Sequence, residues 1–434
     1  MNRIVRTAYF LAVALTLIAC TGGVSSSTYL DAVYEGDAEA VAAALEAGIA
    51  VDTELPLVEL PDYTNEVQGF TALMVAVRYE HIAIVHQLIE AGADVNVRAL
   101  GNVTPLMVAS GIGNAEIVEA LIDAGADITA EDDNGVDALG LAAELGNVDA
   151  VEVLLGVGAE VDARQRDGAT AMMNAAVNGH REVVGILIAA GANPNAMAEE
   201  PESTALMALA EAGDLEMVRF LINQGADPDF RASDSFSALV AAIQNRHISI
   251  VEALIEYGVS IDFDYYNSTN DQYETPLEFA ALTGQEEVVT LLLNGGADPN
   301  RFTNDKSFPL FAASQNGHDT SVRRLLQAGA DPNQVTSYDE TALYAASLEG
   351  RASVVRILIE SGAQLNPENV NGYTPLFAAV FFNHTDALSL LLAGGANPND
   401  SAEIDGERTS ALRYAEQSGY TDTAELLRQY GATE

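Results

Sequence analysis

Residues 102–113 read Asn102-Val-Thr-Pro-Leu-Met-Val-Ala-Ser-Gly-Ile-Gly113. Thr104 is placed to cap the N-terminus of a helix through its hydroxyl. Pro105 falls at the first helical position, where the missing amide hydrogen costs nothing. Gly113 ends this helix after two turns. The segment therefore predicts a short helix with a defined beginning and a defined end.

A second apolar pattern follows at once. Ile117, Val118, Leu121 and Ile122 have the spacing of a single buried stripe on a helix. Gly125 supplies a left-handed cap at the end of this stripe. The two patterns together predict a pair of short helices followed by a loop.

This closing glycine recurs along the chain at a nearly constant interval. The intervals are 33, 33, 33, 34, 33, 38, 33, 33 and 33 residues, between Gly92, Gly125, Gly158, Gly191, Gly225, Gly258, Gly296, Gly329, Gly362 and Gly395. A fixed period near 33 indicates stacked similar repeats, each burying its apolar face against the next. We count about twelve repeats from Thr28 to Ala432.

The pattern resembles the ankyrin repeat family, which combines Gly-x-Thr-Pro-Leu-His-x-Ala-Ala, a later Gly, Val-x-x-Leu-Leu and Gly-Ala-Asp. The matches that carry the resemblance are Gly101-Asn-Val-Thr-Pro-Leu106, Tyr273-Glu-Thr-Pro-Leu-Glu-Phe-Ala-Ala281 and Asn371-Gly-Tyr-Thr-Pro-Leu-Phe-Ala-Ala379. The resemblance implies an all-α solenoid over residues 28–434, with helix-turn-helix repeats joined by β-hairpin-like loops. We expect the first and last repeats to be caps.

The chain departs from the family pattern in one systematic way. The His that follows Leu in the family is replaced by Met74, Met107, Gly140, Met173, Met207, Val240, Glu278, Phe311, Tyr344, Phe377 and Arg413. The hydrogen-bonding role of that His therefore does not transfer. We expect the four Met residues to be core packing rather than a contact surface. Asp137 and Phe308 stand where the capping Thr is expected.

Three insertions interrupt the period, at residues 52–68, 262–272 and 399–407. Insertions in repeat proteins map to exposed loops, often on the binding face. The middle insertion is rich in aromatic residues, with Phe263, Tyr265 and Tyr266 followed by Tyr273. These four residues are candidate partner contacts, because tyrosine is a rigid anchor that can also hydrogen-bond. The alternative is that the rings fold back over the neighbouring repeats.

The charge balance is strongly acidic. The chain has 64 acidic and 19 basic residues, a formal net charge of −45, and Lys306 is its single lysine. Nucleic acid would be repelled, because binding it requires clusters of basic residues. The acidic surface could attract a basic partner or divalent cations. The alternative is a solubility adaptation to a salty habitat, which the even depletion of lysine favours.

The N-terminus has the features of a targeting segment. Arg3 and Arg6 precede an apolar run, Ala8 to Ala19, that ends in Leu17-Ile-Ala-Cys20. This tetrapeptide resembles a bacterial lipoprotein box, which implies a signal peptide at 1–19, an acylated (palmitate-type) anchor at Cys20 and a flexible tether at 20–27. The alternative is an ordinary secretory signal with a chance Cys. We expect a location in the cell envelope, on the outer membrane facing the periplasm, with membrane contact through the lipid anchor alone.

Candidate catalytic and metal sites are weak. Five of the six histidines occupy one equivalent position directly after a first helix, which favours a structural role: His81, His180, His247, His318 and His384. His86, on a second helix, is expected at the surface. The Glu131-Asp-Asp-Asn-Gly135 loop is typical of a turn rather than a calcium site. No nucleophile, phosphate-binding or zinc motif is present. We expect no catalysis, no cofactor and no bound metal.

The resemblance implies a non-enzymatic scaffold that binds an unidentified protein through its concave face, made of the hairpin tips and the first helices. Candidate contacts at the tips are Arg164, Arg166, Asp234, Tyr338, Asp339 and Tyr373. Phe381-Phe382, at the end of a first helix, is a further candidate. We expect a monomer. The alternatives are an envelope hydrolase with a loop-borne site and a structural or cation-binding envelope protein.

Overall fold

The computed structural model describes residues 25–54, 69–199, 201–268, 271–303, 307–404 and 406–433. Cys20, the 1–19 segment, residues 20–24 of the tether, most of the 52–68 insertion and Lys306 lie outside these ranges. The chain divides into two compact units, Met1–Ala205 and Leu206–Glu434. Within the described ranges, no helix has the length and apolar character needed to cross a membrane.

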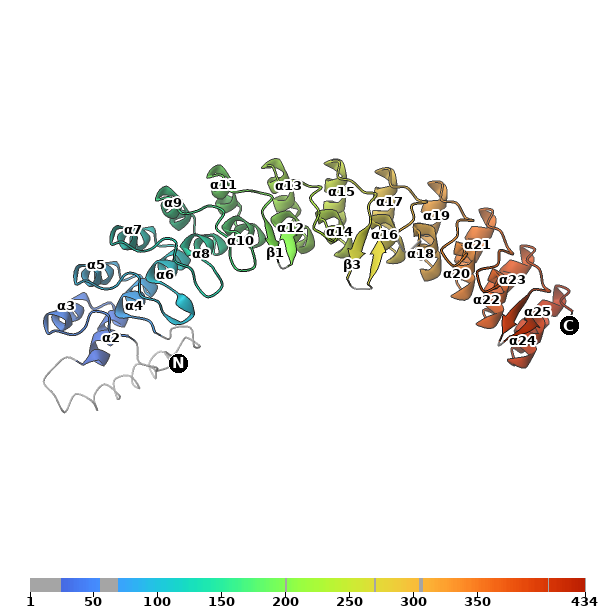
Figure 1. Cartoon of the computed structure of the whole chain (residues 1–434), viewed down its shortest axis with the longest axis horizontal. Coiled ribbons are helices and arrows are strands. Elements are labelled where there is room, and N and C mark those ends of the chain that lie inside the picture. The colour runs from blue at the N-terminus through green and yellow to red at the C-terminus, as the bar shows by residue number, and fades with distance from the viewer. Residues whose placement is uncertain are drawn as a thin grey trace, which may run out of the picture. The chain divides into compact units, whose positions relative to one another are not determined.

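Unit 1 contains five helical pairs among its described residues (Figure 1). Its elements are α2 (Ser26–Glu35), α3 (Ala38–Glu46), α4 (Ala72–Arg78), α5 (Ile82–Glu90), η1 (Leu100–Asn102), α6 (Pro105–Ile112), α7 (Ala115–Asp123), α8 (Ala138–Glu144), α9 (Val148–Gly156), α10 (Ala171–Val177), α11 (Arg181–Ala189), β1 (Met197–Glu199) and β2 (Glu202–Thr204). The first helices of successive pairs form one row and the second helices form another.

Unit 2 contains seven helical pairs among its described residues. Its elements are α12 (Ala205–Ala212), α13 (Leu215–Asn223), α14 (Ala238–Gln244), α15 (Ile248–Glu256), β3 (Tyr265–Asn267), β4 (Gln272–Glu274), α16 (Pro276–Leu282), α17 (Glu286–Asn294), α18 (Pro309–Asn316), α19 (Asp319–Gln327), α20 (Ala342–Leu348), α21 (Ala352–Glu360), α22 (Pro375–Phe381), α23 (Thr385–Ala393), β5 (Ser401–Ile404), β6 (Glu407–Ser410), α24 (Ala411–Gln417) and α25 (Thr421–Gln429). The predicted all-α repeat architecture is confirmed, with twelve pairs over the two units.

The helices begin and end where the sequence predicts. Thr104 Oγ1 accepts a hydrogen bond from the Met107 amide at 3.3 Å, Pro105 is the first residue of α6, and Gly113 caps the helix with φ of 86°. At the start of α8, where the capping Thr is absent, Asp137 Oδ1 accepts the Gly140 amide hydrogen at 2.7 Å. A carboxylate therefore replaces the hydroxyl as cap. Phe308 provides no side-chain cap to α18, in agreement with its sequence.

The core lies between consecutive helical pairs. In the α6–α7 pair, Leu106, Ile117, Val118 and Leu121 are at most 1% exposed. Within a unit, a first helix packs on its own second helix and on first helices of adjacent repeats, as α8 does with α6, α9 and α10. Met74, Met107, Met173 and Met207 are all buried, which confirms that they are core residues.

Side chains in the loops tie each repeat to the next. Asn96 Oδ1 accepts the amide hydrogen of Asp127 at 2.7 Å, and its Nδ2 donates to the Gly125 carbonyl at 3.0 Å. Asn300 makes the same two bonds in unit 2, to the Asp331 amide at 2.7 Å and the Gly329 carbonyl at 3.0 Å. These bonds satisfy backbone groups that no regular sheet covers.

Among the described residues, three antiparallel two-stranded hairpins project from the loops, β1–β2, β3–β4 and β5–β6. Two of them account for the predicted insertions at 262–272 and 399–407. The third predicted insertion, at 52–68, falls mostly outside the described residues. The last helical pair, which is expected to be a cap, presents polar residues to solvent, Arg413, Glu425 and Gln429 among them.

Candidate functional site

The β3–β4 hairpin carries the aromatic insertion, and its register decides which rings face outward. Tyr265 pairs with Glu274, Tyr266 with Tyr273 and Asn267 with Gln272. Because side chains alternate between the two faces of a strand, Tyr265 and Asn267 share one face and Tyr266 lies on the other. The Tyr266 amide donates to the Asp234 carbonyl at 2.9 Å, which fixes the hairpin to the tip of the preceding repeat.

Two of the predicted contact residues are buried. Tyr265 is 1% exposed and its hydroxyl donates to Glu274 Oε2 at 3.1 Å. Phe263 is 6% exposed, with the Arg231 guanidinium 3.9 Å from its ring centre. Both rings are buried, so the structure does not support the predicted contact role of Phe263 and Tyr265. The alternative of rings folding over the neighbouring repeats holds for these two.

The other two rings of the insertion lie on the outer face of the hairpin. Tyr266 and Tyr273 have ring centres 5.5 Å apart, and Tyr273 is 43% exposed. The Tyr266 hydroxyl donates to the Asp271 carboxylate. The antiparallel pairing of β3 with β4 sets the positions of these two rings. Tyr266 and Tyr273 therefore remain candidate contacts.

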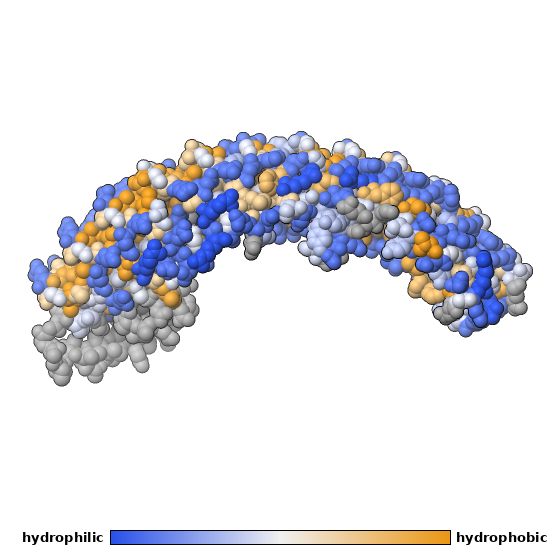
Figure 2. All heavy atoms as spheres, viewed as in Figure 1, coloured by the Kyte–Doolittle hydropathy of each residue, from blue (hydrophilic) through white to orange (hydrophobic). Residues whose placement is uncertain are grey.

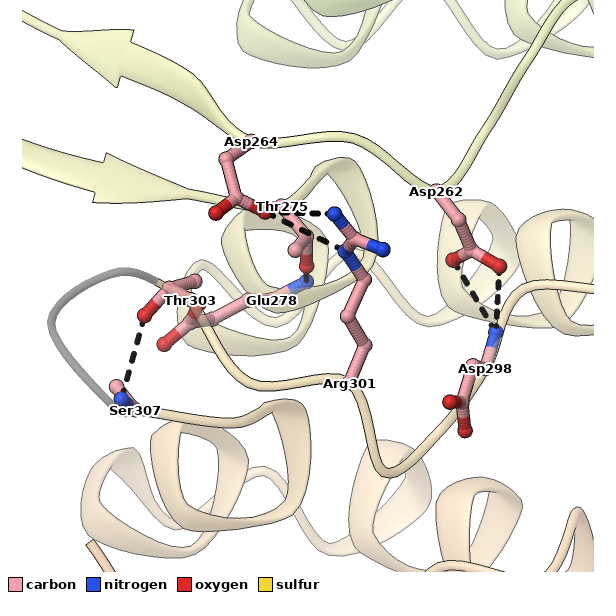
Figure 3. Close-up of polar contacts among 8 residues, drawn as sticks. All are labelled: Asp262, Asp264, Thr275, Glu278, Asp298, Arg301, Thr303 and Ser307. Carbon is pink, nitrogen blue, oxygen red and sulfur yellow. Dashed lines mark hydrogen bonds and ion pairs between the residues drawn. The ribbon is translucent and has the colours of Figure 1, made fainter.

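Two buried carboxyl groups lie close to the start of α16, Glu274 at the end of β4 and Glu278 in α16, and Figure 3 shows Glu278. Glu274 and Glu278 are each 4% exposed. Glu274 Oε2 accepts hydrogen bonds from the Tyr265 hydroxyl and from Asn267 Nδ2, the latter at 2.9 Å. Glu278 extends from α16 toward Thr303 and Ser307. Its Oε2 has no hydrogen-bond partner among the residues that the structure describes.

Burial raises the pKa of Glu278 to about 7, and repulsion from Glu274 adds to this, while a hydrogen bond with the Ser307 side chain acts in the opposite direction. Glu278 occupies the position of the family His, where its backbone amide donates to the capping Thr275 Oγ1 at 3.0 Å. A carboxyl group that titrates near neutral pH can hold or release a proton. The sequence identifies Glu278 as one of the residues that replace the family His, but it does not indicate that this side chain is buried.

An ion pair crosses from this hairpin to the next loop. Arg301 donates to Asp264 Oδ1 from Nη2 at 3.1 Å and from Nε at 3.3 Å. Nearby, Asp262 accepts the Asp298 amide hydrogen at 3.1–3.2 Å (Figure 3). Both carboxylates are thus engaged in tying loops together. No group of three or more His, Cys, Asp or Glu side chains among the described residues is arranged to hold a metal ion.

The histidines have the structural role that their spacing predicts. The Nε2 atoms of five lie 2.8–3.1 Å from a backbone carbonyl of the preceding repeat, as His180 does with Glu144: His81, His180, His247, His318 and His384. Asn147, Gln285 and Arg351 bond to the same kind of carbonyl at the same position. The sequence analysis did not identify these three residues, although each lies at the position that His occupies in other repeats. His86 is exposed, as expected.

The His180 ring also fills the space beside a glycine. Gly146 has φ of 76°, and a Cβ added there would lie 2.4 Å from His180 Nδ1. Glycine at this site therefore permits both the left-handed turn and the approach of the ring. The packing of the His180 ring on Gly146 holds the turn after α8 against the start of α11.

Turn chemistry accounts for the acidic loop at 131–135. Asp132 Oδ1 accepts the amide hydrogens of Asn134 at 2.7 Å and Val136 at 2.8 Å. A carboxylate oxygen that accepts two backbone hydrogens shapes the turn locally. The interpretation as a turn is confirmed.

The remaining predicted residues lie at exposed loop tips. Arg164 is exposed, but its Nη1 donates to the Met197 carbonyl at 2.9 Å, so it also joins adjacent loops. Arg166 is exposed, and its backbone amide donates to the Asn134 carbonyl at 2.9 Å. Tyr338 is 63% exposed. Tyr373 is half-buried, and its hydroxyl donates to the Glu403 carbonyl at 3.3 Å.

A second group of aromatic residues lies on α22 and α24. Phe381 stacks on Tyr414 with ring centres 5.1 Å apart and an interplanar angle of 14°. Phe382 is 51% exposed and lies 5.0 Å from Phe381, between ring centres. The Phe381-Phe382 pair thus has one ring packed among its neighbours and one ring in solvent. Phe382 is therefore available for contact.

Comparison with known proteins identifies the repeat. A family model described as ankyrin repeats in three copies matches residues 106–198, 206–303, 277–369, 310–402 and 366–433, and the single ankyrin-repeat model matches residues 68–100. A segment is 46% identical over 63 residues to the nuclear factor NF-kappa-B p105 subunit of Rattus norvegicus, covering 14% of this chain and 6% of that protein. The shared part is thus a small fraction of the p105 subunit. The matches to the repeat models span most of the sequence, and the chain belongs to the ankyrin-repeat family.

Proposed function

We propose that this protein is a scaffold of the bacterial cell envelope, anchored by a lipid on Cys20, that binds a protein partner through its hairpin tips and first helices. Ankyrin repeats indicate a protein–protein interaction scaffold and are generally non-enzymatic. The envelope location, the anchor and the binding surface are the parts that we propose.

The observation that carries the binding surface is the exposure of large side chains on rigid tips. Tyr273 and Tyr338 are 43% and 63% exposed. The backbone beneath them is fixed by bonds between repeats, such as the Val370 amide to the Tyr338 carbonyl at 3.0 Å. A preformed surface loses little conformational entropy on association, so exposed rings on it contribute efficiently to affinity.

The proposed anchor rests on the N-terminal sequence. An apolar run after Arg3 and Arg6 leads into Leu17-Ile-Ala-Cys20, and Cys20 is the single cysteine of the chain. A lone cysteine cannot form an internal disulfide and would be reactive in an oxidising compartment unless it is capped. Acylation would remove that reactivity and hold the repeats at the membrane surface.

Site-specific photo-cross-linking tests the binding surface. A benzophenone amino acid is placed at Tyr273, Tyr338 or Arg166 and, as a control, at Val157, which is 47% exposed at the end of the second helix α9. We expect one shared partner to be captured from the tip positions and not from Val157. Equal capture from all four positions, or none from the tips, would contradict the proposed surface.

Fractionation tests the anchor separately. The chain should label with an alkyne palmitate analogue and sediment with membranes, whereas Cys20→Ala should do neither. A Cys20→Ala chain that stays in the membrane fraction would refute the lipid anchor and leave the binding surface untouched.

A further inference from the structure

An aromatic surface distinct from the β3–β4 hairpin lies on the last repeats of unit 2. We call it the C-terminal aromatic surface, and it consists of Tyr338, Val370, Tyr373, Phe381, Phe382 and Tyr414. Figure 2 shows apolar residues, in orange, at the surface of the C-terminal repeats of this unit.

Four rings of this surface, those of Tyr373, Phe381, Phe382 and Tyr414, are joined by ring contacts. Phe381 lies between Tyr373, with ring centres 6.5 Å apart, and Tyr414, at 5.1 Å. Phe382 contacts Phe381 at 5.0 Å and is stacked near His384 at 6.2 Å. Half-buried rings thus form a platform on which Phe382 stands exposed.

Hydrogen bonds join the neighbouring loop tips to one another and to the ring cluster. The Val370 amide donates to the Tyr338 carbonyl at 3.0 Å, and the Tyr373 hydroxyl donates to the Glu403 carbonyl at 3.3 Å. Tyr338 and Val370, at 63% and 54% exposed, therefore keep a fixed position relative to the next tip. The surface spans three successive repeats.

The fold does not require aromatic side chains at these exposed positions. The position two residues before His384 and its equivalents is Phe382 in this repeat but is polar in the other repeats from α14 onward: Asn245, Thr283, Asn316, Glu349 and Ser418. At 51% exposure, Phe382 gains little from burial. A cluster of exposed apolar groups in a soluble repeat is typical of an interaction site.

The charge around this surface selects the chemistry of its partner. Residues 335–433 contain 13 acidic residues and 5 arginines, a formal net charge of −8. Glu349, Glu403 and Glu407 are exposed, and Glu349 occupies the position of Phe382 on the adjacent repeat. Three of the arginines are engaged, Arg428 with Glu416, Arg408 with Ser401 and Arg351 with the Gln315 carbonyl, while Arg413 is exposed.

We propose that the C-terminal aromatic surface binds an arginine-rich segment of a partner protein, with guanidinium groups over the exposed rings and against the surrounding carboxylates. A guanidinium on an aromatic face gains from the ring quadrupole, and Arg231 makes this contact with Phe263 inside the same unit at 3.9 Å. An acidic segment would be repelled. This inference rests on the proposed scaffold function and names the partner's chemistry.

Fluorescence anisotropy with a labelled peptide of alternating arginine and glycine tests the inference. The measurements are made at about 0.15 M salt, where attraction between exposed charges is screened beyond about 8 Å. The variants Phe382→Ser and Tyr338→Ala leave the net charge unchanged. Tyr430→Ala is the matched control, because Tyr430 is 43% exposed at the end of the second helix α25. Circular dichroism verifies that each variant remains folded.

We expect saturable binding of the arginine peptide, weakened about twofold to fivefold by Phe382→Ser or Tyr338→Ala and unchanged by Tyr430→Ala. A peptide with citrulline in place of arginine, which lacks the charge, should not bind. Equal binding to the Phe382→Ser and Tyr338→Ala variants would show general attraction to an acidic protein and overturn the inference. Binding of the citrulline peptide with equal affinity would also overturn it.

Failure of this inference is distinguishable from failure of the scaffold proposal. If the arginine peptide does not bind while cross-linking at Tyr273 or Tyr338 captures a partner, the scaffold stands and the partner's proposed chemistry is wrong. If the peptide binds as expected but the tips capture nothing, the proposed envelope partner is wrong and this surface remains a cation-selective site.

Discussion

Replacing Glu278 should remove a pH dependence of stability from unit 2. In the folded chain burial raises the pKa of this carboxyl from 4.5 to about 7. Below pH 4.5 the group is protonated in both the folded and the unfolded chain, so it has no effect on stability. As the pH rises from 4.5 to 7, the unfolded chain releases this proton first, and the folded state loses stability.

The size of the effect follows from the shift. One pKa unit corresponds to about 1.4 kcal/mol, so the carboxyl costs the folded state about 3 kcal/mol above pH 7. Glu278→Gln keeps the shape of the side chain without its charge. Glu278→Met introduces the residue found at Met74, Met107, Met173 and Met207, which are buried at the equivalent position. We therefore expect both variants to be more stable than the native chain at pH 8.

Urea unfolding followed by circular dichroism measures this difference. Between pH 5 and pH 8 the stability advantage of Glu278→Gln over the native chain should grow by about 2.5 kcal/mol. Hydrogen exchange of the α16 amides locates the change, because repeats can unfold partly independently. Glu287→Gln, at an exposed position of α17, should show no such growth. Parallel profiles for Glu278→Gln and the native chain would refute the reasoning.

The remaining predictions concern the joints between repeats. Gly146→Ala and Gly179→Ala both force alanine into a left-handed conformation, which costs about 1–2 kcal/mol. In Gly146→Ala the new Cβ would also clash with the His180 ring, whereas nothing lies within 4 Å of a Cβ added at Gly179. Thermal unfolding should therefore show the larger loss for Gly146→Ala, and equal losses would contradict the close contact. His180→Ala should lose about 1 kcal/mol with its bond to the Glu144 carbonyl, and it should reduce the additional cost of Gly146→Ala in a double-mutant cycle. Asp137→Ala should cost about 1 kcal/mol through the lost cap, whereas Asp137→Thr should retain stability, as urea midpoints would report.

The repeat architecture could be predicted from the sequence because its determinants are local. Thr104, Pro105 and Gly113 specify one helix through capping, proline geometry and left-handed φ, and each acts within a few residues. The period of the glycines then places every copy. The position of the histidines likewise predicted a structural role, which their bonds to the preceding repeat confirm.

The candidate site could be predicted only in part, because burial in an insertion depends on strand register. Tyr265 and Tyr266 are neighbours of the same residue type, yet one is 1% exposed and the other lies on the opposite face of β3. Composition identifies the aromatic insertion, but only the pairing with β4 distinguishes the two sides. The same limit applies to Glu278, whose environment is set by Glu274 and by Ser307, four residues before and 29 residues after it in the chain.

The departures from the family pattern are where this chain acquires properties of its own. At the position of the family His, the buried methionines of α4, α6, α10 and α12 give way to Glu278 in α16 and Phe377 in α22. Glu278 places a titrating carboxyl beneath the hairpin that presents Tyr273, and Phe377 supports Tyr373 and Tyr414 at 5.7 and 5.9 Å between ring centres. Each replacement lies in the core but faces a candidate contact surface. Because the shared pattern fixes the repeat architecture, we propose that selectivity for a partner follows from such replacements and from the hairpins that they support.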